Sequence, residues 1–320
     1  MPSEFAIENP LRRPTVLVVG SGRSGTTWLS DEIAARTGTH PVFEPLHCYR
    51  VANVPHWGLR GEHAGMYLTR RDQCPEMQQF FERLLDDELS NAWTRQDWRR
   101  IPRWAERFPL AERVFYRVAA YHNRRATRQG THSVIKLIKS NLMLDWIDRH
   151  FDVKLLYVIR HPCQVIGSRM KHDWQGDLAD ITEQANLMQE LQAYRSLIDS
   201  AQTPLQQLAV FWCVENRIPL QQAPESDWLC HTYEACVIET PNVFASIDQW
   251  LDASLDRSPS PQEARRRREP NVSQFDTTRP WHHPLTEREG EEVLEYCEGF
   301  GIQLYGKDSR PQTTLREALR

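Results

Sequence analysis

The chain has 320 residues, with 39 basic and 43 acidic side chains and a formal net charge of −4. Hydrophobic residues at 40% and charged residues at 26% are typical of a globular protein rather than a disordered or fibrous one. The small acidic surplus argues against nucleic acid as a partner. No apolar run approaches the length of a membrane span, about 18 residues. The first residues lack the apolar core of a signal peptide, so we expect a cytoplasmic protein.

Apolar runs with the character of buried strands recur along the chain. The first, Val16–Val19, ends at Gly20 and is followed by helical spacing over residues 26–38. Further strands are expected at residues 133–138, 153–159 and 228–233. Because helical sequence separates these strands, we predict an α/β fold with a central parallel β-sheet flanked by helices.

Other segments predict helices or loops. Residues 76–89 and 179–200 have helical periodicity, and Thr286-x-x-Glu289 is a capping box that begins a C-terminal helix. The arginine-rich residues 95–128 are either a solvated helix face or an acceptor groove. Residues 255–284, rich in proline, serine and arginine, predict a long surface loop or lid. No composition break marks a second domain, so we expect one domain over residues 1–320.

The seven cysteines are odd in number and widely spaced, without a Cys-x-x-Cys pair. This pattern argues against a disulfide framework and against a structural zinc site. We therefore expect reduced cysteines that act as small apolar residues.

Residues 20–28, Gly-Ser-Gly-Arg-Ser-Gly-Thr-Thr-Trp, lie between the first strand and its helix. Glycines there permit positive φ, and the first amides of a helix form an anion site. The spacing of the outer glycines is that of a P-loop, but Thr26 stands where that motif needs lysine. The side chains suited to holding a phosphate or sulfonate are Arg23, Ser24, Thr26 and Thr27.

A second anion site is expected at the end of the third predicted strand. Arg160 follows that strand, Pro162 suits the first turn of a helix, and Ser168 lies two turns further on. An arginine at the carboxyl edge of a parallel sheet lies where such folds bind ligands. The alternative for Arg160 is a surface salt bridge. We expect the neighbouring Arg169 to face solvent.

These segments together resemble the sulfotransferases that use 3′-phosphoadenosine 5′-phosphosulfate (PAPS), in particular the carbohydrate-type and bacterial members. Residues 23–29, Arg-Ser-Gly-Thr-Thr-Trp-Leu, are similar to the family's 5′-phosphosulfate loop. Residues 156–162 with Ser168 are similar to its 3′-phosphate motif. Residues 43–47, Phe-Glu-Pro-Leu-His, and 232–234, Thr-Tyr-Glu, are similar to two further family segments.

The resemblance implies a three-layer fold like that of P-loop NTPases. Residues 14–38 correspond to the 5′-phosphosulfate strand, loop and helix, and residues 153–170 to the 3′-phosphate strand and helix. The implied reaction moves a sulfonate from PAPS to a hydroxyl of a glycan, glycolipid or small natural product. It releases 3′-phosphoadenosine 5′-phosphate (PAP) and requires no metal. The sequence does not determine the oligomeric state.

The resemblance also implies roles for individual residues. Trp28 either stacks on the adenine or packs in the core, and Tyr233 is a weaker candidate for the same nucleotide. The residues that it assigns to the nucleotide are Gly22, Arg23, Ser24, Gly25, Thr26, Thr27, Trp28, Arg160, Ser168 and Tyr233.

Three residues are candidates for the chemistry. Arg23 is expected to stabilise the leaving phosphate. Glu44 is our choice of general base, because it follows the helix that leaves the loop and can return to the ligand edge of the sheet. His47 is the rival base, with a more convenient unperturbed pKa.

Two other functions compete with sulfonyl transfer. One is a P-loop kinase that uses ATP and magnesium, which Thr26 and Arg160 disfavour because that chemistry needs a lysine and an aspartate at these places. The other is a non-catalytic nucleotide-binding or glycan-binding module, which would bind PAP without a functional base.

Overall fold

The computed structural model describes residues 15–37, 39, 41–51, 53–55, 65–91, 93–96, 134–174, 176–251, 285–308 and 310–318. The predicted loop 255–284 lies outside these residues, as does all but the first two residues of the arginine-rich segment 95–128.

In the described part of the chain, five parallel strands form one sheet in the order β2-β3-β1-β4-β5. The strands are β1 (Thr15–Val19), β2 (Pro41–Phe43), β3 (Val134–Leu137), β4 (Val153–Ile159) and β5 (Leu229–Thr232). Four of them confirm the predicted strands. The central β1 is buried on both faces, which explains its unbroken apolar sequence.

Helices surround the sheet and include several short 3₁₀ turns (η). Their bounds are α1 Thr26–Thr37, α2 Pro75–Leu85, η3 Asn141–Met143, α4 Leu144–His150, α5 Pro162–Lys171, α6 Ala179–Thr182, α7 Ala185–Glu190, η4 Gln192–Tyr194, α8 Arg195–Asp199, α9 Pro204–Gln222, η5 Ala223–Glu225, α10 Tyr233–Ile238, α11 Thr240–Trp250, α13 Glu287–Gly299 and η7 Leu315–Glu317.

Two helix predictions have different outcomes. Thr286 caps α13 in a capping box with Glu289, as expected. Residues 179–200 are largely helical, as the periodicity predicted, but they form the separate short helices α6, α7, η4 and α8 rather than one continuous helix. The apolar spacing persists across the breaks, since Ile181, Leu187 and Ile198 are all fully buried.

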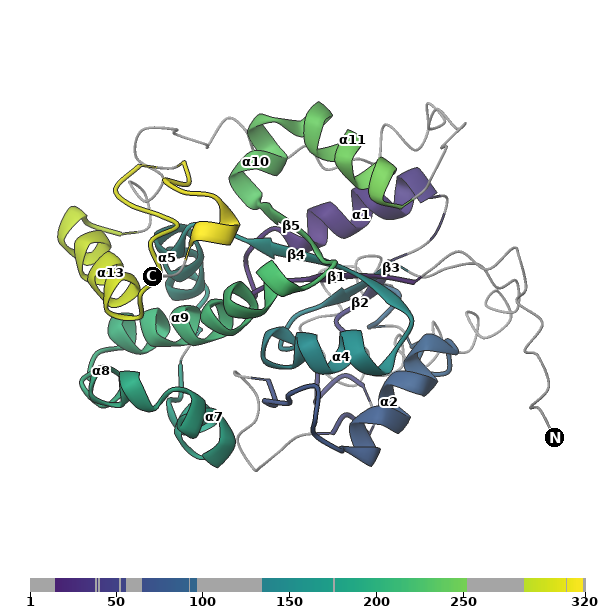
Figure 1. Cartoon of the computed structure of the whole chain (residues 1–320), viewed down its shortest axis with the longest axis horizontal. Coiled ribbons are helices and arrows are strands. Elements are labelled where there is room, and N and C mark those ends of the chain that lie inside the picture. The colour runs from purple at the N-terminus through teal and green to yellow at the C-terminus, as the bar shows by residue number, and fades with distance from the viewer. Residues whose placement is uncertain are drawn as a thin grey trace, which may run out of the picture.

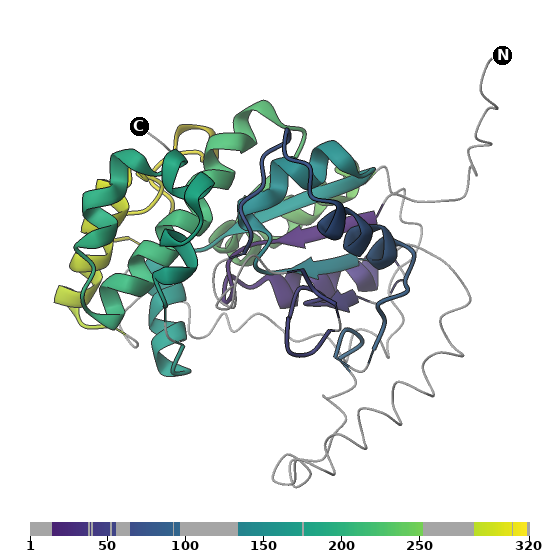
Figure 2. The same ribbon diagram turned by 90° about the horizontal axis from the view of Figure 1, so that it is seen from below.

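The helices form layers on the two faces of the sheet (Figures 1 and 2). One face is covered by α1, α10 and α11, whose apolar side chains pack on Val16, Val18 and Leu156. The other face packs against α4 and α9 in a larger core that includes Leu17, Val19 and the outward helices α2 and α13. This three-layer arrangement leaves the carboxyl ends of the strands accessible for a site.

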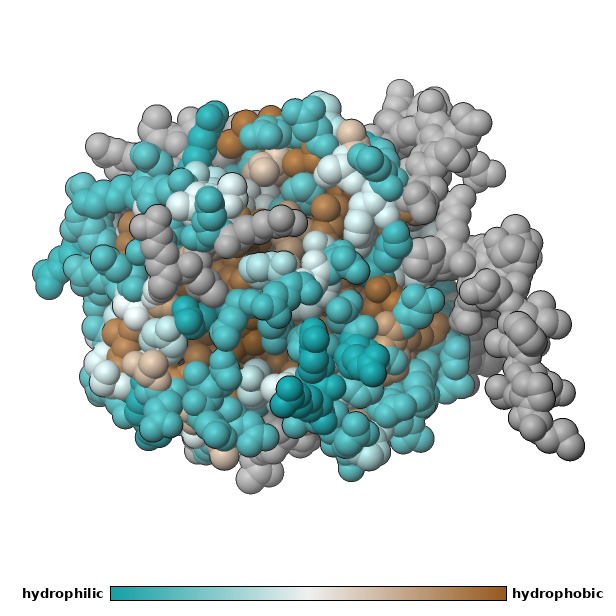
Figure 3. All heavy atoms as spheres, in the orientation of Figure 1, coloured by the Kyte–Doolittle hydropathy of each residue, from teal (hydrophilic) through white to brown (hydrophobic). Residues whose placement is uncertain are grey.

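The surface in Figure 3 is predominantly hydrophilic on the face shown. Among the described helices, none combines the length and the apolar character needed to cross a membrane. The structure contains no disulfide bond between the seven cysteines, all of which it describes.

Candidate functional site

The loop between β1 and α1 is shaped by close packing at its glycines. Gly25 has φ of +85°, and a Cβ built on it would lie 2.2 Å from the ring of Tyr233. A Cβ on Gly20 would lie 2.4 Å from the carbonyl oxygen of Val158. Because a side chain fits at neither position, the loop backbone lies directly against β4 and α10. It forms a narrow turn at the amino end of α1, where backbone amides can face an anion.

Arg23 stands in this loop at a φ of +78°. Its Nε donates to Oγ of Ser168 at 2.9 Å, and its Nη2 donates to Nε2 of His172 at 3.1 Å. Nη1 of Arg160 donates to the carbonyl oxygen of Arg23 at 3.1 Å. The fold therefore brings together Arg23, Arg160 and Ser168, which the sequence predicted to serve two separate anion sites.

Two guanidinium groups whose positive charges act on each other favour the binding of an anion. Burial lowers the pKa of Arg23 first, and the positive charge of Arg160 lowers it further. An anion placed between these groups would remove that repulsion. The charge arrangement fits the phosphate groups of a nucleotide.

Aromatic side chains lie beside this pair. The guanidinium of Arg160 lies 4.4 Å from the ring centroid of Tyr233. Trp28 is half-buried and meets Tyr233 edge to face at 6.3 Å and Phe244 at 6.0 Å. Trp28 thus contacts the core and also borders the site, so both predicted roles stay compatible with its position.

The prediction that Arg169 faces solvent is wrong. Its side chain is 4% exposed and forms an ion pair with Glu215 of α9 at 2.7 Å. Its Nε and Nη2 each donate to the carbonyl oxygen of Gly22 at 3.3 Å. Arg169 therefore holds the loop backbone at Gly22. The face of α5 that carries Arg169 packs against α9 rather than facing water.

Glu44 lies on the other side of the loop, immediately after β2, with φ of +42°. Its carboxylate is ion-paired with Nζ of Lys136 on β3, and the two side chains are 13% and 5% exposed. Lys136 also lies 4.4 Å from the ring centroid of Phe43. Burial lowers the pKa of Lys136, although the Glu44 charge opposes that shift. The negative charge of Glu44 also raises the pKa of Arg23, against its overall lowering.

His47 lies in the turn that Glu44 begins. The amide of His47 donates to the carbonyl of Glu44 at 3.2 Å, and its ring contacts that of Trp93 with centroids 4.7 Å apart. Burial and then the charge of Lys139 lower the pKa of His47. The imidazole is therefore neutral at pH 7 and chemically able to accept a proton.

Three buried polar atoms around the loop lack hydrogen-bond partners among the described residues: Oγ of Ser24, Nε1 of Trp28 and Nε of Arg160. Buried polar groups are normally hydrogen-bonded, so unpartnered atoms around one loop indicate that a ligand or solvent supplies their hydrogen bonds. Together with the tight loop and the paired arginines, they fit a nucleotide that carries phosphate groups.

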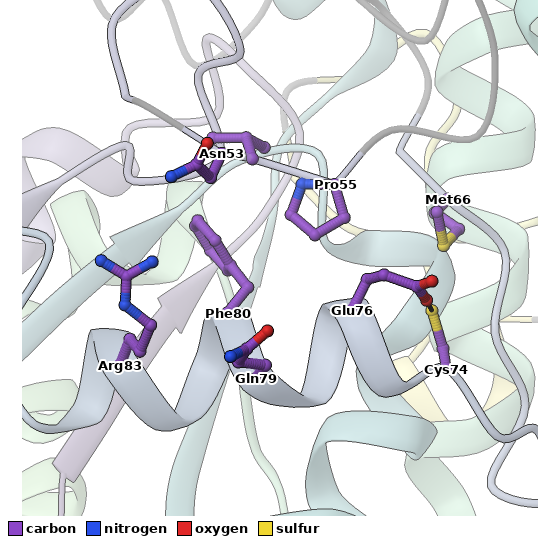
Figure 4. Close-up of a pocket in the computed structure, with 9 residues that line it drawn as sticks. Asn53, Pro55, Met66, Cys74, Glu76, Gln79, Phe80 and Arg83 are labelled. Atoms are coloured by element: carbon purple, nitrogen blue, oxygen red, sulfur yellow. Dashed lines mark hydrogen bonds between the residues drawn. The ribbon is translucent and has the colours of Figure 1, made fainter.

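The cavity in Figure 4 lies elsewhere, between α2 and the loop 53–55, with a volume of about 550 Å³. Phe80 and Arg83 of α2 line it, and none of the predicted site residues does. It is not the site described above.

Sequence reasoning missed four residues of the site: Lys136, Arg169, His172 and Glu215. Lys136 had a usable signal, because a lysine inside the apolar run 133–138 is buried on a central strand and needs a partner. The other three gave no local signal, since their contacts join α5 to the loop and to α9.

A model of the sulfotransferase family matches residues 14–214, whereas no curated protein matches the chain. Among solved structures, the chain is similar at 18% identity to the sulfotransferase domain of the Synechococcus PCC 7002 olefin synthase. This match covers 95% of this chain and 100% of that chain, with a TM-score of 0.41. It is also similar at 18% identity to sulfotransferase STF9 from Mycobacterium avium, with 93% and 79% covered and a TM-score of 0.41.

A third similar structure is retinol dehydratase in complex with retinol and PAP, at 18% identity, with 95% of this chain and 74% of that chain covered and a TM-score of 0.35. The family model spans well over half of the chain and includes the loop, β3, β4 and α5. The chain belongs to the sulfotransferase family.

Proposed function

We propose that this sulfotransferase moves a sulfonate from PAPS to a hydroxyl group of a glycan, glycolipid or small natural product and releases PAP. The observation that carries the proposal is the position of Arg23. It contacts the α5 residue Ser168 and, through its carbonyl, Arg160. The paired Glu44 and Lys136 belong to the end of β2 and to β3, which lie on the other side of β1 from β4. A donor site and a proton acceptor thus flank one cation.

The donor would be held by the loop and by the edge of β4. Residues 22–27 supply amides and hydroxyls for the 5′-phosphosulfate, and Arg160 with Ser168 are assigned to the 3′-phosphate. Trp28 and Tyr233 border the place for the adenine. We also propose that residues 1–320 form one catalytic domain, since the C-terminal α13 packs on α5 and α9 of the same core.

The chemistry follows from groups that the chain supplies. Bound PAPS provides an activated sulfonate. Arg23 neutralises the charge that develops on the leaving phosphate, where electrostatic stabilisation acts in a site partly shielded from water. The carboxylate of Glu44 accepts the proton of the acceptor hydroxyl. Lys136 orients that carboxylate through their ion pair, and His47 is the alternative base.

The test is incubation of the purified protein with labelled PAPS and a panel of alcohols, with mass detection of an added sulfonate and of PAP. The proposal predicts a mass gain of one sulfonate and an equal amount of PAP. Metal-dependent turnover of ATP would instead favour a kinase. Tight binding of PAP with no transfer to any alcohol would favour a binding module.

A further inference from the structure

Three charged residues that follow neighbouring strands have left-handed backbone conformations. Arg23 follows β1 with φ of +78°, Glu44 follows β2 with φ of +42°, and Lys139 follows β3 with φ of +67°. A long side chain is less stable in this region than in the ordinary backbone conformations. Backbone strain of this kind is concentrated at functional sites. Arg23 and Glu44 already have proposed roles, whereas Lys139 has none.

The fold holds Lys139 in this conformation from outside. A Cβ built on Gly65 would lie 1.7 Å from the carbonyl oxygen of Lys139, so the two backbones are in close contact. The amide of Leu68 donates to the carbonyl of Leu142 at 3.1 Å, which secures the crossing segment. Glycine or asparagine would adopt the same φ at a lower cost. The backbone therefore gives no reason for a lysine at this position.

The charge of Lys139 is also uncompensated. Within the described part of the chain, Lys139 has no ion-pair partner, whereas the buried cations Lys136 and Arg169 are paired with Glu44 and Glu215. Its ammonium lies close enough to His47 for its charge to act on that imidazole. Lys139 therefore lies near the alternative base His47 without a counter-ion among the described residues, and such a lysine can bind an external anion.

The sheet order assigns Lys139 to the acceptor side of the site. In the order β2-β3-β1-β4-β5, the strand that precedes Lys139 lies between those that precede Glu44 and Arg23. The residues assigned to the nucleotide, Arg160 and Tyr233, follow β4 and β5 on the other side of β1. When the hydroxyl of an acceptor approaches Glu44, the rest of the acceptor molecule therefore lies near Lys139.

We propose that Lys139 binds an anionic group of the acceptor, so that the enzyme acts on alcohols that carry a carboxylate or a sulfate near the reacting hydroxyl. This inference rests on the proposed sulfotransferase function. A charge-assisted hydrogen bond to such a group contributes about 1.5–3 kcal/mol, which corresponds to a preference of about ten- to a hundredfold over a neutral analogue.

The test compares matched acceptors with labelled PAPS at saturation. Two pairs each consist of a hydroxy acid and its methyl ester: 4-hydroxyphenylacetate with its ester, and a uronic acid glycoside with its ester. A third pair consists of a sulfated sugar and the same sugar without the sulfate. The kcat/KM ratio of each pair is measured for the wild type, Lys139→Asn and Lys139→Arg. Asparagine keeps the positive φ and removes the charge, and arginine restores the charge. Lys307→Gln, which removes an exposed lysine paired with Glu291, is the control.

The wild type is expected to prefer the charged member of at least one pair by about tenfold or more. Lys139→Asn reduces this preference to about twofold or less, Lys139→Arg and Lys307→Gln keep it, and the Kd of PAP stays the same in all four proteins. The carboxylate and sulfate pairs distinguish the two anions. Equal rates for charged and neutral members in the wild type, or a preference that survives Lys139→Asn, would overturn the inference.

A weaker affinity of Lys139→Asn for PAP would also overturn it, because Lys139 would then belong to the donor site. Failure of the underlying function has a different signature. In that case the wild type would transfer sulfonate to no alcohol, charged or neutral, whether or not it binds PAP.

Discussion

Glu44 and Lys136 form an ion pair between the residue that follows β2 and a residue inside β3, and the lysine is the more deeply buried partner. The amide of Glu44 also donates to the carbonyl of Lys136 at 3.1 Å, so backbone and side chains link the same two residues. This double link sets the position of the proposed base at the edge of the sheet. Its carboxylate is ion-paired with the buried Lys136, and its charge also acts on Arg23.

The Glu44–Lys136 pair predicts a split between turnover and nucleotide affinity. Glu44→Gln keeps the shape of the side chain and removes its basicity, so kcat falls by about a hundredfold or more, while the Kd of PAP stays within about twofold. Steady-state kinetics and a PAP titration measure both. His47→Ala is the matched comparison. Full activity of Glu44→Gln together with an inactive His47→Ala would assign the base to His47.

Removal of Arg160 is expected to affect the 3′-phosphate in particular. Arg160→Ala weakens binding of PAPS or PAP by about ten- to a hundredfold, as for a lost charge-assisted contact. Binding of adenosine 5′-phosphosulfate, which lacks the 3′-phosphate, changes much less. Calorimetric titration of both nucleotides measures the difference, and Arg195→Ala, at an exposed arginine paired with Asp199, serves as the control. Equal losses for both nucleotides would remove the role assigned to Arg160.

Arg169 is expected to support both stability and the loop. Arg169→Met leaves Glu215 buried without its partner, which costs about 3–5 kcal/mol of the free energy of unfolding. The double variant Arg169→Met with Glu215→Met removes both charges, so most of that stability returns. The carbonyl of Gly22 still lacks its donor, so affinity for PAP stays reduced. Urea denaturation and PAP titration test this, and normal PAP affinity in the double variant would show that Arg169 does not position the loop.

His161 predicts a pH dependence of stability. Burial lowers its pKa to about 4, and its ring bonds to the carbonyl of Gly306 and to the amide of Cys163. Above pH 6.5 both the folded and the unfolded states hold a neutral imidazole. As the pH falls from about 6.5 to about 4, only the unfolded state binds the proton, so the free energy of unfolding decreases by about 1.4 kcal/mol per pH unit from this group.

The comparison for that prediction is His161→Gln, which lacks the titrating imidazole. Its free energy of unfolding is lower at pH 7, because the two ring hydrogen bonds are altered, but it falls less steeply between pH 6.5 and 4. Denaturation curves at several pH values give both slopes. Identical slopes in the two proteins would show that His161 does not titrate as its burial predicts.

Local sequence patterns were sufficient for most of the fold. The strands β1, β3, β4 and β5 are apolar runs long enough to recognise, and the capping box of α13 marks its beginning. The strand β2 escaped prediction because it has three residues and begins with a proline. Over residues 179–200 the apolar periodicity predicted helix but not where each helix ends. The periodicity continues across the breaks because the short helices bury the same side.

The part of the candidate site that lies in one contiguous loop was predictable from the sequence. The part that forms where distant segments meet was not. Residues 20–28 are contiguous, and Arg160 with Ser168 lie on one strand and helix. The partner of Glu44 is 92 positions away, and that of Arg169 is 46 positions away. These pairings depend on how β2 joins β3 and how α5 packs on α9, which a single sequence does not display.

A crystal structure of the protein with PAP at a saturating concentration tests the central claim most directly. We expect electron density for the nucleotide at the carboxyl edge of the sheet. Its 5′-phosphate lies against residues 20–25, and its 3′-phosphate lies between Arg160 and Ser168. An empty loop under these conditions, or a 3′-phosphate remote from Arg160, would contradict the account.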